Sequence, residues 1–114
     1  MRYIKNISEP WFSLIKLGLK TCEGRLNKGD FAKMQPGDVI EFTNQELGFH
    51  RSCIVRVISI KEYPSFEKYL VSETLKRCLP GISTYSDGLS VYYKYFSTRD
   101  EAEYGIVAIG VEII

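Results

Sequence analysis

The order of strand-like and helix-like segments constrains the fold of this chain most strongly. Strand-forming segments stand at both ends, and most are connected by turns rather than by regular crossover helices. The patterns predict strands over residues 1–7, 21–26, 39–42, 53–60 and 104–113. Pro36-Gly37-Asp38 is a turn signal directly before one of them. A doubly wound parallel sheet needs a helix between successive strands, so we expect an α+β domain with a curled or barrel-like sheet.

Helical periodicity is found in the first and the middle part of the chain. It predicts helices over residues 11–19, 66–73 and 75–79. Ser8 is expected to cap the first of them, and Pro80-Gly81 to end the third. Residues 82–87 are expected to form a loop, whereas 88–96 suit either a helix or a strand.

Length and charge narrow the class of protein. The 114 residues are enough for one domain over 1–114 with a single core. The formal net charge of +1 gives no overall attraction to nucleic acid or to anionic lipid, although a local basic patch stays open. The beginning of the chain lacks an apolar signal sequence, and no apolar run is long enough to span a bilayer. We therefore expect a soluble intracellular protein, cytoplasmic or nuclear, without a membrane partner.

The cysteines point away from a disulfide framework. Cys22, Cys53 and Cys78 are odd in number and widely spaced, which suits a reducing compartment. None forms a CxxC pair, and the single histidine cannot complete a common zinc site. We expect no metal and no cofactor.

The segment with the most chemistry is Gly18-Leu19-Lys20-Thr21-Cys22-Glu23-Gly24-Arg25. Glu23 and Arg25 are two residues apart, so on a strand they share one face and can offer an acceptor and a donor fork to a base or a phosphate. The alternative is a structural Glu–Arg ion pair. Lys20 could bind a phosphate or act as a base if desolvated, or it could be a solvated lysine at a helix end.

For other candidate site residues, the sequence allows both a binding role and a structural role. Gly24 suits either a close ligand approach or a packing gap under Trp11, and Trp11 suits either a stacking surface or the core. An aromatic-rich region begins at residue 85, and Tyr93 and Tyr95 are the two rings that we expect at the rim of a cleft. The region around His50, including Arg51, is expected to be a solvated loop.

The order and spacing of several segments resemble the ASCH domain of the PUA-like superfamily. The segments are Glu9-Pro10-Trp11-Phe12, the motif GxKTxExR over 18–25, Gly37-Asp38-Val39-Ile40-Glu41-Phe42 and Leu79-Pro80-Gly81. The resemblance covers nearly the whole chain, as in a free-standing small member. It implies a β-barrel of about five or six mostly antiparallel strands with flanking helices. It also implies a cleft where the first helix meets the motif strand.

The resemblance also implies a function, because the family is associated with RNA. We expect RNA or a nucleotide-like ligand to be bound by Trp11, Lys20, Thr21, Glu23, Gly24, Arg25, Tyr93 and Tyr95. One alternative is a hydrolase of RNA or of a modified nucleoside, with Lys20 and Glu23 as catalytic residues. The family includes ribonucleases and N4-acetylcytidine amidohydrolases, but Glu23 stands where the amidohydrolases have a catalytic threonine. The other alternative is a protein-interaction module of a coactivator type, and the oligomeric state is left open.

Overall fold

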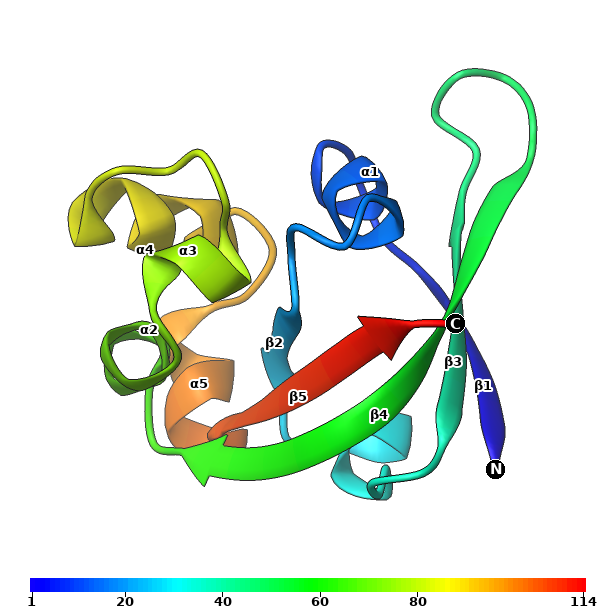
Figure 1. Cartoon of the computed structure of the whole chain (residues 1–114). Coiled ribbons are helices and arrows are strands. Elements are labelled where there is room, and N and C mark those ends of the chain that lie inside the picture. Colours follow the sequence, from blue (N-terminus) through cyan, green and yellow to red (C-terminus); the bar gives the residue numbers. More distant parts are fainter.

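Five strands form one curled sheet in the computed structural model, which describes residues 1–114 (Figure 1). The strands are β1 (Arg2–Asn6), β2 (Cys22–Leu26), β3 (Val39–Asn44), β4 (Arg51–Tyr63) and β5 (Ile106–Ile113). Their order in the sheet is β1-β3-β4-β5-β2. Only the pair β1/β3 is parallel, and the other neighbours are antiparallel. The α+β class is confirmed, and the barrel takes the form of an open half-barrel whose edge strands are β1 and β2.

The long strand β4 gives the sheet its curvature. It pairs with β3 along its first half and with β5 along most of its length, and the register shifts between Val57 and Ser59. A bulge of this kind bends a strand and increases its twist. Opposite the bulge, Ser59 Oγ lies 2.2 Å from the place that a Cβ atom on Gly110 would occupy, so only glycine fits there without a shift.

Most of the helices lie at one end of the sheet, and the first helix lies apart from them (Figure 1). α1 (Trp11–Lys16) lies at the open side, and a 3₁₀ turn, η1 (Gly29–Ala32), follows β2. The others gather at one end of the sheet, namely α2 (Phe66–Glu73), α3 (Leu75–Cys78), α4 (Tyr85–Tyr93) and α5 (Thr98–Tyr104). None of these helices is long and apolar enough to cross a membrane.

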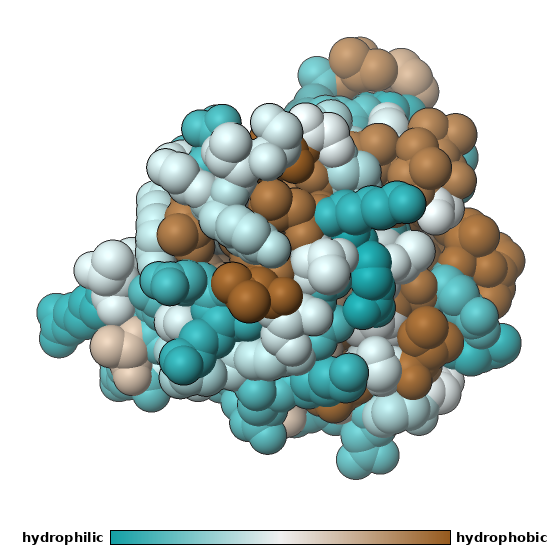
Figure 2. All heavy atoms as spheres, turned by 60° about the vertical axis from the view of Figure 1, so that its left-hand side comes forward, coloured by the Kyte–Doolittle hydropathy of each residue, from teal (hydrophilic) through white to brown (hydrophobic).

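Two hydrophobic cores result, and β5 separates them. Val107, Ile109 and Val111 face the core between the sheet and α1. Ile106 and Ala108 face the core that lies under α2, α3 and α4. The side chain of Trp11 packs against both cores, so it marks the place where they meet. On the side that carries the helices, hydrophobic atoms come to the surface in small groups between polar ones (Figure 2).

Two helical segments differ from the sequence-based expectation. α4 begins at Tyr85, inside the expected loop 82–87, because Thr84 caps it by accepting a hydrogen bond from the Asp87 N–H. α5 was not expected, and Tyr104 belongs to it rather than to the last strand. Ser97 starts α5 in the same way, through a bond from the Asp100 N–H.

The start of α1 also differs. Ser8 does not cap this helix through its side chain, since its hydroxyl lies 3.2 Å from the Tyr95 hydroxyl. The Glu9 carboxylate takes that role and accepts from the Ser13 N–H at 2.9 Å. Ser8 is thereby free to reach a distant part of the chain, which matters for the site described next.

Candidate functional site

A cavity of about 270 Å³ opens at the seam between the end of β1 and the edge of β2 that pairs with no other strand. Its walls come from four separate stretches of sequence. These are the end of β1 with the start of α1, the motif around β2, the residue after α3, and the aromatic-rich region around the end of α4. The lining residues are Asn6, Ile7, Ser8, Trp11, Lys20, Glu23, Arg25, Leu79, Val91, Tyr92, Tyr95 and Phe96.

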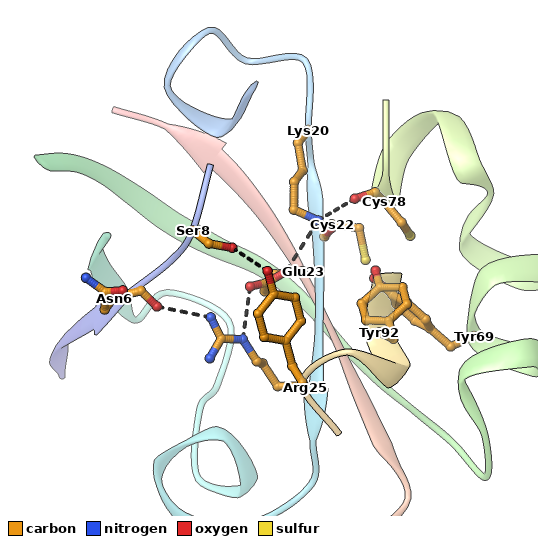
Figure 3. A network of polar contacts seen from close by, with 10 residues as sticks. Asn6, Ser8, Lys20, Cys22, Glu23, Arg25, Tyr69, Cys78 and Tyr92 are labelled. Carbon is orange, nitrogen blue, oxygen red and sulfur yellow. Dashed lines mark hydrogen bonds and ion pairs between the residues drawn. The ribbon is translucent and has the colours of Figure 1, made fainter. Parts of the chain in front are cut away.

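The alternation along β2 sorts the motif into two faces. Glu23 and Arg25 point toward the cavity, and Arg25 Nε donates to Glu23 Oε2 at 3.0 Å (Figure 3). Cys22 lies in the core under the helices, as expected. Gly24 faces that core too, and a Cβ atom there would lie 2.5 Å from Cζ of the Tyr69 ring. Glycine is therefore required at position 24 because the ring of Tyr69 packs against it. The expected packing gap under Trp11 is not the reason.

Lys20 is buried, with only 2% of its surface exposed. α1 ends at Lys16, so Lys20 follows the helix instead of lying solvated in its last turn. Its Nζ atom donates to the carbonyl oxygens of Cys22, at 2.7 Å, and of Cys78, and it lies 3.3 Å from Glu23 Oε1. An ammonium group has three protons to donate, and these three acceptors match that number. Lys20 thus fixes its neighbours and has no proton left over for a ligand.

Glu23 is a buried carboxylate whose charge is balanced from two sides. Burial alone would raise the pKa of Glu23, but the charges of Lys20 and Arg25 and their hydrogen bonds outweigh it and lower the pKa. Glu23 is therefore ionised at neutral pH, and both of its oxygens face cations. A carboxylate with a lowered pKa is a weak general base.

Arg25 is the member of this network that keeps donors free. Its Nε is bound to Glu23, and Nη2 lies 3.3 Å from the carbonyl oxygen of Asn6, across the seam on β1. Its guanidinium lies 4.9 Å from the centre of the Phe31 ring, which supports it from one side. Nη1 has no partner in the protein, although the side chain lines the cavity. The arginine is held in place and presents its outer edge to whatever enters.

A contact between two hydroxyl groups joins two other walls of the cavity. The contact between Ser8 and Tyr95 joins the segment after β1 to the segment after α4 (Figure 3). Tyr95 keeps 56% of its surface exposed, so this contact lies at the surface. Behind it, Tyr92 is buried, and its hydroxyl lies 2.9 Å from that of Tyr69. The cavity therefore has a polar rim and an aromatic back wall.

The structure brings together five of the eight predicted site residues: Trp11, Lys20, Glu23, Arg25 and Tyr95. The other three lie elsewhere. Thr21 is near Arg77, whose Nε lies 3.4 Å from its Oγ1, and Gly24 packs against Tyr69. The hydroxyl of Tyr93 donates to the Glu101 carboxylate, so it is directed away from the cavity.

Sequence reasoning missed Asn6 and Ser8 as lining residues. Asn6 ends β1 and Ser8 follows it closely, and short polar residues at the end of a strand are too common to indicate a site. Leu79 also lines the cavity, and it belongs to the segment Leu79-Pro80-Gly81 that contributed to the resemblance.

Arg51 corrects another expectation. It was expected in a solvated loop, but its guanidinium donates to Glu9 at 3.0 Å and to Asn44 at 2.7 Å. It also lies 4.9 Å from the centre of the Phe12 ring. Arg51 therefore anchors the start of α1 to the sheet rather than facing solvent.

Comparison with known proteins agrees with this architecture. The family model of the ASCH domain matches residues 6–114. No curated protein matches the chain. Among solved structures, the hypothetical protein PH0355 is 33% identical with a TM-score of 0.89, and the match covers 100% of both chains.

Two further structures are similar. Protein PF0455 from Pyrococcus furiosus is 37% identical with a TM-score of 0.79, over 100% of this chain and 98% of that one. The ASCH domain from Lactobacillus crispatus shares 16% identity and a TM-score of 0.61, over 97% of this chain and 79% of that one, which shows a common fold. The family model spans almost the whole chain, so this protein belongs to the ASCH domain family.

Proposed function

We propose that this protein binds RNA or a nucleotide-like ligand and takes one nucleotide-sized group into the cavity at the seam. The observation that carries the proposal is the free edge of Arg25, held at a cavity whose back wall is aromatic. An arginine edge suits the oxygens of a phosphate or two acceptors on the edge of a base. Aromatic walls suit the face of a base.

The size of the cavity supports a single group rather than a long strand. Its volume of about 270 Å³ lies just below the range of about 300–1,000 Å³ that is common for small-molecule sites. The net charge of +1 also argues against a surface that follows many phosphates. Binding should therefore depend on few ionic contacts.

In this proposal the buried residues position the contacting one. Lys20 holds Glu23 in place, and Glu23 holds Arg25 Nε, so the outer edge of Arg25 is fixed before the ligand arrives. A donor that is oriented in advance loses less conformational entropy when the ligand binds. Lys20 and Glu23 are positioning residues here, and Arg25 is the one that touches the ligand.

The same geometry disfavours acid–base chemistry by Lys20 and Glu23. Lys20 donates to three protein acceptors, and Glu23 has a lowered pKa and two cations beside it. Neither group matches a catalyst that exchanges a proton near neutral pH. We therefore place binding ahead of hydrolysis.

The test is a binding and turnover assay with a matched pair of arginine variants. Short single-stranded and double-stranded RNAs, mononucleotides and N4-acetylcytidine are incubated with the wild type, Arg25→Ala and Arg56→Ala. Arg56 is the control because it is exposed and lies outside the cavity, and its replacement by alanine removes the same charge as Arg25→Ala. Loss of a charged hydrogen bond worth about 1.5–3 kcal/mol should weaken binding by about 10- to 100-fold in Arg25→Ala only.

Each outcome separates the hypotheses. Intact ligand that is retained by the wild type and by Arg56→Ala, but released by Arg25→Ala, supports the proposal. Binding should depend only weakly on salt. In a plot of the logarithm of the binding constant against the logarithm of the salt concentration, each phosphate contacted in a single strand should contribute a slope of about −0.7. Cleavage or deacetylation would move the protein to the hydrolases. Equal weakening in both variants would mean nonspecific charge attraction, and the absence of any binding would favour a protein partner.

A further inference from the structure

Directly behind the cavity lie two of the three cysteines, on elements that are far apart in the sequence. Cys22 begins β2, and Cys78 ends α3. Both are buried in the core under the helices, next to Tyr69 and Tyr92. Figure 3 shows their side chains beside each other, between the motif strand and the helices.

The backbone holds these two residues close together. The carbonyl oxygens of Cys22 and Cys78 both accept a hydrogen bond from the same atom, Lys20 Nζ. One position before each cysteine, the Thr21 N–H donates to the carbonyl oxygen of Arg77 at 3.0 Å. The two cysteines are thus fixed relative to each other at two successive positions by bonds to the main chain.

Their side chains lie beside each other (Figure 3), and the interaction between the two thiols shifts their pKa values in opposite directions. The bond from Cys22 lowers the pKa of Cys78, with further help from Tyr69 and from the charge of Lys20, whereas Cys22 has its pKa raised. Cys78, whose pKa is lowered, is the thiol that we expect to react first with an oxidant. The third cysteine, Cys53, lies in the other core, on the sheet side of the molecule.

We propose that Cys22 and Cys78 are a redox-active thiol pair, which a small peroxide converts into an intramolecular disulfide between β2 and α3. Leu79 and Tyr92 line the cavity and belong to the same core as the two thiols, so the cavity is the side from which a small oxidant would reach them. Hydrogen peroxide is small enough to enter this cavity. The proposal does not depend on the identity of the ligand.

The reaction balances with hydrogen peroxide as the oxidant. The thiolate of Cys78 attacks one peroxide oxygen, the O–O bond breaks, and the released hydroxide takes up a proton to become water. The sulfenic acid that forms on Cys78 is then attacked by the sulfur of Cys22. The S–O bond breaks, a second water leaves, and the S–S bond forms. The two thiols lose two hydrogen atoms in total, and the peroxide is reduced to two waters.

The experiment treats the folded, reduced chain with hydrogen peroxide, quenches it, and counts free thiols after denaturation. The chain has three free thiols before treatment. We expect one afterwards, a mass lower by two hydrogen atoms, and a crosslinked peptide that joins Cys22 to Cys78. Cys53→Ser is the matched control, which should form the same crosslink and keep no free thiol.

The proposal is overturned by any of three results. The wild type could keep three thiols, could gain oxygen atoms without a crosslink, or could crosslink only between molecules. Cys78→Ser should keep both of its remaining thiols, whereas Cys22→Ser should gain oxygen on Cys78 and form no intramolecular crosslink. Loss of thiols from Cys78→Ser would also overturn the proposal. Because a buried serine can unfold the core, the peptide map of the wild type decides the matter even where a variant does not fold.

Discussion

Lys20 Nζ and Glu23 Oε1 lie 3.3 Å apart beneath the cavity, and both side chains are almost completely buried. Arg25 binds the other oxygen of Glu23, and two main-chain carbonyls complete the surroundings of Lys20. The motif therefore forms a supporting framework beneath the cavity, and Arg25 is its outer member.

Replacing Lys20 by methionine should destabilise the protein by about 3–5 kcal/mol, because it leaves buried Glu23 with one cation and two carbonyls without a donor. Urea denaturation followed by circular dichroism measures this. The double variant Lys20→Met/Glu23→Gln should recover part of the loss, since the uncompensated charge is gone. A midpoint for Lys20→Met equal to that of the wild type would show that the network carries no stability.

Stability should fall at acid pH in a way that Glu23→Gln suppresses. The pKa of Glu23 is lower in the folded than in the unfolded chain, where it is about 4.3. Its contribution is therefore fully present above that value and is lost as the pH falls through the folded pKa. The difference in unfolding free energy between the wild type and Glu23→Gln should shrink over this window. A difference that is independent of pH below 5 would contradict the lowered pKa.

Gly24→Ala should destabilise the protein by about 1–3 kcal/mol, because the added methyl group would meet the ring of Tyr69 at 2.5 Å. Thermal unfolding measures the loss. In a Tyr69→Leu background the same substitution should be much less harmful, since the ring atoms that it meets are absent. An equal loss in both backgrounds would point to the strand conformation rather than to the ring.

Arg51→Lys should cost about 1–3 kcal/mol, whereas Arg56→Lys on the same strand should change the stability by less than about 0.5 kcal/mol. Arg51 bonds to both Glu9 and Asn44, and lysine cannot reproduce that fork. Arg56 is half exposed, and the distance of 4.0 Å between its Nη1 atom and Glu112 Oε1 is long for an ion pair. Chemical denaturation measures the midpoints of the two variants. Similar midpoints would show that Arg51 does not anchor α1 to the sheet.

The strands were predictable because their signals are local. The β-branched run from Cys53 to Ile60 and the turn before Val39 indicate strands without any tertiary information. α5 was missed because its sequence is polar and short. Its buried member, Glu101, accepts a long-range hydrogen bond from the Phe66 N–H and another from the hydroxyl of Tyr93, eight residues before it. The parallel pairing of β1 with β3, in which Arg2 lies beside Val39, joins segments far apart in the sequence and leaves no local pattern either.

The motif was visible in the sequence, but its roles were not. Spacing alone placed Glu23 and Arg25 on one face, and their ion pair confirms that geometry. The burial of Lys20 depends on the carbonyl of Cys78, which is 58 residues away. Tyr93 and Tyr95 cannot be told apart from spacing, because which ring reaches the rim depends on where α4 ends and on the position of Ser8.

The pairing of β2 has a consequence for the time at which the cavity forms during synthesis. β2 carries Glu23 and Arg25, and its partner in the sheet is β5, which is made more than 80 residues later, with Cys22 opposite Gly110. A nascent chain that has already exposed the whole motif still lacks the strand that fixes it. Contacts between such distant segments form late, because the entropy of closing the long loop is lost before any pairing is gained. A chain in which β5 has not yet been made therefore carries the whole motif without the strand that supports the cavity.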